Sequence, residues 1–224
     1  MASAVCENCG AENNPSLVVC PYCRATIPQT GVQPDSSLAK IASLYAEGKV
    51  DKALQLIATL ERERPKTEND AAFLVLYCKI LFESEGPLGK LRILLGKAFV
   101  VAPANPEVME YLEILDAREK FDLGMKEIGE NTLKALLKRS PKNFHALFML
   151  GTHLFWAKRD VDMAMHYLER CVLIRPTLLR AWACLGAIYK ATGRKELSAC
   201  AFRKCIELET NPQMRNYFKS LMAL

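Results

Sequence analysis

From Ser37 to the end of the chain, apolar residues recur three or four positions apart, which is the spacing of amphipathic helices. The alternation of apolar and polar residues that is typical of strands is absent from this part. Prolines close successive apolar stretches at Pro65, Pro103, Pro141 and Pro176, which lie 38, 38 and 35 residues apart. A period of this length indicates repeated helix pairs, so the pattern predicts an all-α solenoid.

The last period resembles the tetratricopeptide repeat. The segment from Trp182 to Tyr189, WACLGAIY, has the W-x2-L-G-x2-Y pattern of that family, and Gly193 follows where a left-handed glycine would end the first helix. Small, aromatic and small residues then follow at the family's spacing in the second helix: Ser198, Phe202 and Cys205. The resemblance implies two helices that cross closely at the small residues.

Weaker versions of the same pattern precede this repeat. We therefore predict about five tetratricopeptide-like helix-turn-helix repeats over residues 37–212, with repeat three near residues 108–143 in the least secure register. Residues 213–224 would form a helix that caps the open end of the array, because each repeat buries its apolar face only against its neighbours. Residues 29–36, which include Gly31 and Pro34, are predicted to be a linker.

The beginning of the chain carries two CxxC pairs, formed by Cys6 with Cys9 and by Cys20 with Cys23. Two residues between cysteines let a tight turn present both sulfurs to one ion, and two such turns complete a tetrahedral thiolate shell. The segment is too short to fold by apolar burial, so metal binding would supply its folding free energy. The spacing predicts one structural zinc ion, although iron in a rubredoxin-like site would use the same four cysteines.

Residues 5–28 resemble the short zinc-ribbon family in their CENCGAEN and CPYC segments, which implies a zinc ribbon over residues 1–28. They depart from it at Arg24, where a second glycine often follows the last cysteine. A redox pair or two disulfides are the alternatives. A thioredoxin-like redox pair would need a βαβ context, which the sequence lacks.

The composition changes this picture little. Half of the 224 residues are hydrophobic and a quarter are charged, which is ordinary for a globular protein. No apolar run approaches the ~18–20 residues that span a bilayer, so we expect no membrane insertion. Nine cysteines, an odd number, without a secretory signal favour a reducing compartment, and we expect a cytoplasmic protein.

Catalytic motifs are missing from the sequence. HExxH, GxSxG, Walker A and GxGxxG patterns do not occur, and no acidic partner stands at motif spacing to His145, His153 or His166. We interpret these histidines as helix-surface or groove residues and predict that the protein is not an enzyme. Cys171 and Cys205 occupy a small-residue position of their repeats, and packing explains them.

The resemblance to tetratricopeptide repeats also implies a binding groove, lined by the first helix of each repeat at roughly positions 2, 5, 9, 12 and 13. In repeats four and five the candidate partner-binding residues are His145, Phe148, Thr152, Phe155, Trp156, Arg180 and Lys190. Repeat two adds Lys79 and Phe82, and repeat one adds Leu38, Ala42 and Tyr45. Such a groove combines aromatic anchors with scattered cations, which are side chains that often dominate interface energies.

Two functional hypotheses remain. In the first, the protein is a scaffold or adaptor that binds protein or peptide partners in the groove, with the zinc ribbon as a second docking module. In the alternative, the ribbon contacts DNA or RNA and the repeats tether it to a complex. Residues 1–36 carry Arg24 against Glu7, Glu12 and Asp35, a net charge of −2 that leaves +7 for the rest of the +5 chain. An acidic ribbon argues against phosphate binding and favours the adaptor.

Overall fold

The computed structural model describes residues 4–5, 12–13, 36–63, 70–157 and 160–222. The four predicted zinc ligands and residues 29–35 of the predicted linker lie outside the described residues. The chain divides into two compact units, residues 1–41 and residues 42–224.

In the first unit, β1 (Ala4–Val5) pairs with β2 (Glu12–Asn13) in antiparallel orientation. Ala4 lies opposite Asn13, and Val5 lies opposite Glu12. Cys6 and Cys9 fall between these two strands in the sequence. A ribbon of two such short strands is not stable by itself in water, so it needs support from another source.

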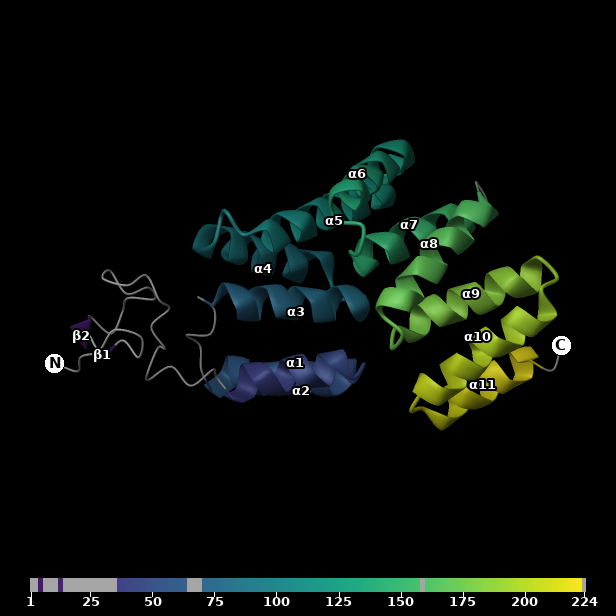
Figure 1. Ribbon diagram of the computed structural model, residues 1–224, viewed down its shortest axis with the longest axis horizontal. Helices are drawn as coiled ribbons and strands as arrows, with labels where there is room; N and C mark the ends of the chain where they lie inside the picture. Colours follow the sequence, from purple (N-terminus) through teal and green to yellow (C-terminus); the bar gives the residue numbers. More distant parts are fainter. Residues whose placement is uncertain (1–3, 6–11, 14–35, 64–69, 158–159, 223–224) are drawn as a thin grey trace. The chain divides into compact units, whose positions relative to one another are not determined.

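The other described elements are helices (Figure 1). Their bounds are α1 (Ser36–Ala46), α2 (Val50–Glu63), α3 (Ala71–Glu83), α4 (Leu88–Val101), α5 (Pro106–Asp122), α6 (Lys126–Arg139), α7 (Phe144–Trp156), α8 (Val161–Ile174), α9 (Leu179–Ala191), α10 (Lys195–Leu208) and α11 (Pro212–Met222).

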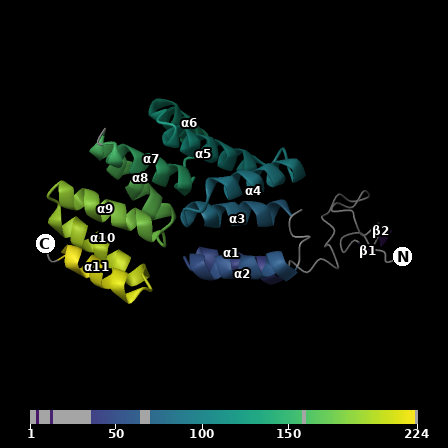
Figure 2. The same ribbon diagram turned by 180° about the vertical axis from the view of Figure 1, so that it is seen from behind.

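Consecutive helices of the second unit pack in pairs, α3 with α4, α5 with α6, α7 with α8, and α9 with α10. Each second helix also contacts the next pair, and the first helices α3, α5, α7 and α9 contact one another in that order. The reverse view in Figure 2 shows the same succession, with α11 beside α10. The prediction of an all-α array of paired helices is confirmed for the described residues from 36 onward.

Three of the four prolines that revealed the repeat follow helix ends, and Pro65 lies outside the described residues. Helices α4, α6 and α8 each end two residues before Pro103, Pro141 and Pro176, respectively. The residues directly before these prolines share an extended φ, from −126° to −142°, with ψ from 69° to 76°. A proline ring disfavours helical geometry in the residue before it, so the chain turns at the same point in each repeat.

Within the helix pairs, glycines provide the left-handed backbone that a tight turn requires. Gly48, Gly124 and Gly193 have φ values of 77°, 75° and 73°. The expectation that Gly193 ends the first helix of its repeat in this conformation is therefore confirmed. In the turn between α3 and α4, Glu85 adopts a left-handed φ of 57° instead.

The last repeat shows how the family motif packs. A Cβ atom added to Gly186 would lie 2.6 Å from Cε1 of Phe202, so only glycine lets α9 and α10 approach this closely. The Ser198 hydroxyl donates to the Gly186 carbonyl at 2.9 Å, and Cys205 is fully buried. Trp182 donates from its ring N–H to the Pro176 carbonyl at 2.9 Å. The motif residues thus hold the helix pair and its entry loop together.

Candidate functional site

The first helices of four successive repeats enclose a pocket of about 150 Å³, which we call the central pocket. Its lining residues come from the end of α3, the α3–α4 turn, α5, α7 and α9: Phe82, Glu85, Arg118, His145, Phe148, Met149, Thr152 and Arg180. Four of the seven predicted partner-binding residues are among them, namely His145, Phe148, Thr152 and Arg180. A pocket of this volume suits one side chain of a partner, because sites for small molecules occupy ~300–1,000 Å³.

His145 lies deeper than the sequence suggested. It is 4% exposed, and its ring lies among Phe82, Tyr111 and Phe144, with ring centroids 5.8, 5.4 and 4.1 Å away, respectively. The interpretation of the histidines as surface or groove residues therefore misses the burial of His145. Its aromatic neighbours come from α3, α5 and the start of α7, so His145 forms the base of the central pocket and joins three repeats.

The hydrogen bonds of His145 define its protonation. Nε2 lies 3.1 Å from the Lys79 carbonyl oxygen, which can only accept, so Nε2 carries the proton. Nδ1 lies 2.8 Å from the Tyr111 hydroxyl and accepts from it. Burial, together with the nearby positive charges of Lys79 and Arg175, lowers the pKa of His145 to about 3, although the hydrogen bond to the Lys79 carbonyl opposes this change. The neutral imidazole is thus a fixed structural connection with both nitrogens engaged.

Arg180 and Glu85 form the polar side of the central pocket. The Arg180 guanidinium pairs with the Glu85 carboxylate and lies 4.9 Å from the centroid of the Phe148 ring. From α5, Arg118 donates through Nη1 to the Gly86 carbonyl at 3.4 Å, a long hydrogen bond. Two guanidiniums and one carboxylate therefore border the pocket, which leaves a net positive charge beside its apolar base.

Three further predicted partner-binding residues lie along α7, and of these only Thr152 lines the central pocket. The Thr152 hydroxyl donates to the Phe148 and Met149 carbonyls of its own helix at 2.8 and 3.1 Å. Phe155 and Trp156 lie outside the central pocket at the end of α7, with ring centroids 5.0 Å apart, and Trp156 is 71% exposed.

Lys190 also lies outside the central pocket. Its ammonium donates to the Leu221 carbonyl of α11 at 3.2 Å. In this structure Lys190 thus connects α9 to the last helix, at the end of α11 where a cation is favourable.

A second hollow of about 500 Å³, the loop pocket, lies where the α6–α7 connection meets α3, α5 and the end of α1. Its lining residues are Tyr45, Lys79, Glu107, Glu110, Tyr111, Ser140, Pro141, Lys142, Asn143 and Phe144. Lys79 and Glu107 form an ion pair, and Glu110 accepts from Ser140 and from Asn143. Of the groove residues expected in repeats one and two, Tyr45 and Lys79 lie here, and Phe82 lies in the central pocket.

Sequence reasoning missed the residues of repeat three. Counted from Pro106 as position one, Glu107, Glu110 and Arg118 stand at positions 2, 5 and 13, which are among the positions that the resemblance assigns to a groove. The missed signal was local: the Asn105 side chain accepts from the amides of Glu107 and Val108, and an Asn-Pro pair is a strong start for a helix. The sequence analysis placed the start of this repeat near residue 108, whereas α5 begins at Pro106, so the groove positions were counted from the wrong residue.

A buried arginine connects repeats that are distant in sequence. Arg175, only 9% exposed, donates to the carbonyls of Tyr45 and Ala46 at the end of α1 and to the Glu83 carboxylate at 3.2 Å. Its guanidinium also lies 4.3 Å from the centre of the Tyr45 ring. Burial raises the pKa of Glu83, and the Arg175 charge opposes that change. The connection between α8 and α9 is thereby fixed to the end of α1.

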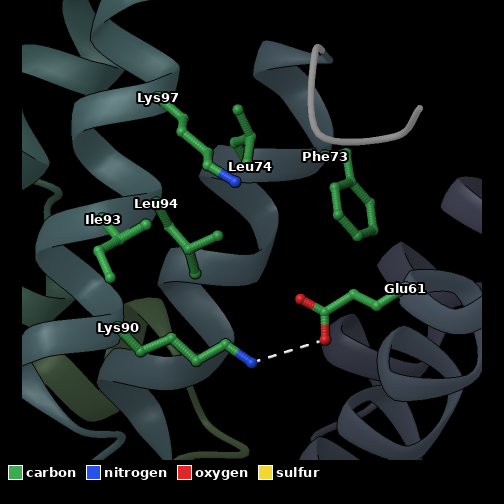
Figure 3. Close-up of a pocket in the computed structure, with 7 residues that line it drawn as sticks. All are labelled: Glu61, Phe73, Leu74, Lys90, Ile93, Leu94 and Lys97. Atoms are coloured by element: carbon green, nitrogen blue, oxygen red, sulfur yellow. Dashed lines mark ion pairs between the residues drawn. The ribbon is translucent and has the colours of Figure 1, made fainter. Parts of the chain in front are cut away.

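A third pocket, of about 350 Å³, lies among α2, α3 and α4 and contains none of the predicted site residues. Figure 3 shows Glu61 of α2 facing Lys90 of α4, an ion pair of 3.5 Å, while Phe73 and Leu94 line the apolar part. Ile93 on its border is 60% exposed. We call this the α2–α4 pocket.

Among the described residues, no three His, Cys, Asp or Glu side chains are grouped so that they could hold a metal ion. In the same part of the chain, no helix combines the length and the apolar character that crossing a membrane requires.

Comparison with known proteins agrees with this geometry. The tetratricopeptide repeat family model matches residues 144–178 and 179–212, which contain the helix pairs α7–α8 and α9–α10. No curated protein matches the sequence.

Among solved structures, the chain is similar to TTC0263, a thermophilic TPR protein in Thermus thermophilus. The two are 18% identical, the match covers 84% of this chain and 98% of that chain, and the TM-score is 0.53. YrrB, titled a TPR protein with an unusual peptide-binding site, is 14% identical over 82% of this chain and 90% of its own, with a TM-score of 0.42. MamA is 18% identical over 75% and 93%, with a TM-score of 0.42. The family model thus identifies tetratricopeptide repeats over residues 144–212, and the likeness to TTC0263 extends to the fold of the array alone.

Proposed function

We propose that this chain, which carries tetratricopeptide repeats over residues 144–212, is a non-enzymatic adaptor that binds a segment of a partner protein at the central pocket. One observation carries the proposal. Five of the residues that the family pattern assigns to a binding groove line a single pocket, and Arg118 joins them from a position that the same pattern assigns to repeat three. Helices of this fold family commonly act as protein-binding scaffolds, but fold alone does not name a partner.

The composition of the pocket supports binding of a peptide. Phe82 and Phe148 offer apolar surface at its base, and arginines at its border can pair with polar groups of the segment. His145 serves this function indirectly, because its two hydrogen bonds fix the spacing of α3, α5 and α7 at the base of the site.

A photo-crosslinking experiment tests the proposal. A diazirine side chain introduced at Met149, on the pocket lining, is compared with the same group at Arg203, which is exposed on α10. After irradiation in extract of the native cells, position 149 is expected to yield a discrete partner adduct that Phe148→Ala abolishes. Equal adducts from both positions, or adducts insensitive to Phe148→Ala, would contradict the assignment.

We further propose that residues 1–28 form a structural zinc ribbon that provides a second docking surface. The two CxxC pairs support it, and so does the pairing of β1 with β2 on either side of the Cys6–Cys9 pair in sequence. Metal analysis of freshly purified, reduced protein should find one zinc per chain. Cys20→Ser should release it while the helical circular-dichroism signal survives; a metal-free wild-type protein would refute the ribbon.

A further inference from the structure

We propose that the central pocket selects acidic segments and that Glu85 holds the place of the partner's carboxylate in the free protein. This inference rests on the proposed function, and it adds the chemistry of the partner and a residue that competes with it.

The backbone of Glu85 is the first observation. The corresponding turns in three other repeats have glycine in the left-handed conformation, at Gly48, Gly124 and Gly193, whereas this turn has Glu85 at φ 57°. A residue with a Cβ atom loses energy in that region, and glutamate lacks the short side chain that lets Asn or Asp form local hydrogen bonds there. Glycine would make this turn at lower cost, so the turn itself does not explain the glutamate.

The direction of the Glu85 side chain is the second observation. Its carboxylate pairs with Arg180, a residue 95 positions away on α9, and both residues line the central pocket. The Glu85 side chain is 64% exposed, and exposed ion pairs contribute little to stability. The pair therefore contributes little to the fold while it places a carboxylate at the border of the pocket.

The charges around that position are the third observation. Glu85 is the only acidic side chain that lines the central pocket among the residues the structure describes, and it stands with Arg118 and Arg180. Arg118 donates a long hydrogen bond to the carbonyl of the neighbouring Gly86. When Glu85 swings away, two guanidiniums border the same hollow, and guanidiniums bind carboxylates through paired hydrogen bonds.

The apolar part of the pocket completes the specificity. Arg180 lies over the Phe148 ring, 4.9 Å from its centroid, and this contact keeps the guanidinium beside the apolar base of the pocket. A partner segment that inserts one apolar side chain against Phe148 therefore brings its neighbouring carboxylate to Arg180. The ligand class is an acidic segment with interspersed apolar residues, and it must displace the carboxylate of Glu85.

Fluorescence anisotropy with two labelled octapeptides tests this inference on the full-length protein. The acidic probe alternates Leu and Glu, and the matched neutral probe alternates Leu and Gln. We expect the wild-type protein to bind the acidic probe at least tenfold more tightly at low salt. Arg118→Gln and Arg180→Gln should each reduce this preference.

The competing role of Glu85 is tested by Glu85→Asn, because asparagine tolerates the left-handed backbone without a charge. This variant should bind the acidic probe about threefold more tightly than wild type and the neutral probe with unchanged affinity, as expected for loss of an exposed ion pair. Glu207→Gln on α10 removes the same charge away from the pocket and controls for net charge.

Three results would overturn the inference: equal binding of the two probes, binding of neither probe, or equal gains from Glu85→Asn and Glu207→Gln. These results leave the proposed function standing if the adduct at position 149 persists. Loss of that adduct would instead remove the proposed function itself.

Discussion

His145 makes the stability of the array depend on pH in a way that can be calculated. The histidine is neutral and buried in the folded protein, with its pKa lowered to about 3, whereas in the unfolded chain it titrates near ~6.5. Between these two values the unfolded state binds more protons than the folded state, so the free energy of unfolding rises with pH. The contribution of His145 is complete above pH ~6.5 and is lost progressively as the pH falls toward about 3.

The size of this effect follows from the difference between the two pKa values. Each pH unit below the unfolded pKa costs about 1.4 kcal/mol, so acidification from pH 7.5 to pH 5 removes about 2 kcal/mol through His145 alone. Other ionisable groups of the chain also contribute to the pH dependence of stability. The comparison therefore needs a variant, and His145→Asn removes the titratable ring while it can still accept the hydrogen bond from Tyr111.

Urea unfolding followed by circular dichroism at 222 nm measures the effect at pH 7.5, 6.5 and 5. The Asn variant is expected to be less stable at pH 7.5, but its free energy of unfolding should fall by about 2 kcal/mol less than that of wild type on acidification. The difference in pH dependence does not require equal stabilities. Parallel pH profiles for the two proteins would refute the burial of a neutral His145. An NMR signal of His145 that titrates near pH 6.5 would refute it as well.

Three further predictions concern packing and burial. Gly186→Ala should destabilise the protein by about 1–3 kcal/mol, because the new methyl group would overlap Phe202. Gly96→Ala, in open space on α4, should instead stabilise the protein by about 0.5–1 kcal/mol. Urea midpoints that shift in the same direction for both variants would contradict this. Arg175→Met should lower the free energy of unfolding by about 3–5 kcal/mol, because it leaves Glu83 buried without its partner. The folded pKa of Glu83 then rises further, so this loss of stability should grow as the pH rises. A loss that does not depend on pH would argue against the pair. N-ethylmaleimide should label the exposed Cys200 in the folded protein but Cys78 only after unfolding, because Cys78 is buried and burial raises its pKa to about 12. Peptide mapping by mass spectrometry measures the labelling of each cysteine. Equal labelling rates for the two cysteines would contradict the burial of Cys78.

Local sequence was sufficient for the elements and their pairing. Prolines at a regular period end α4, α6 and α8 because the residue before a proline avoids helical geometry, and this restriction acts whatever the rest of the chain does. The left-handed turn at Gly193 and the close packing of Gly186 against Phe202 were also predictable from local sequence, because each contact lies within one repeat. The predicted residues at the central pocket followed from counting positions within the first helix of each repeat.

What surrounds those residues was decided by contacts between repeats. Arg175 binds the carbonyls of Tyr45 and Ala46 about 130 positions earlier in the chain, and Arg180 meets Glu85 across 95 positions. The burial of His145 likewise depends on Phe82 and Tyr111 from two other repeats. Helix periodicity fixes which face a side chain occupies, but small rotations between successive repeats accumulate along the array. That accumulated geometry, which no local pattern encodes, determines which faces meet and which groove positions become buried.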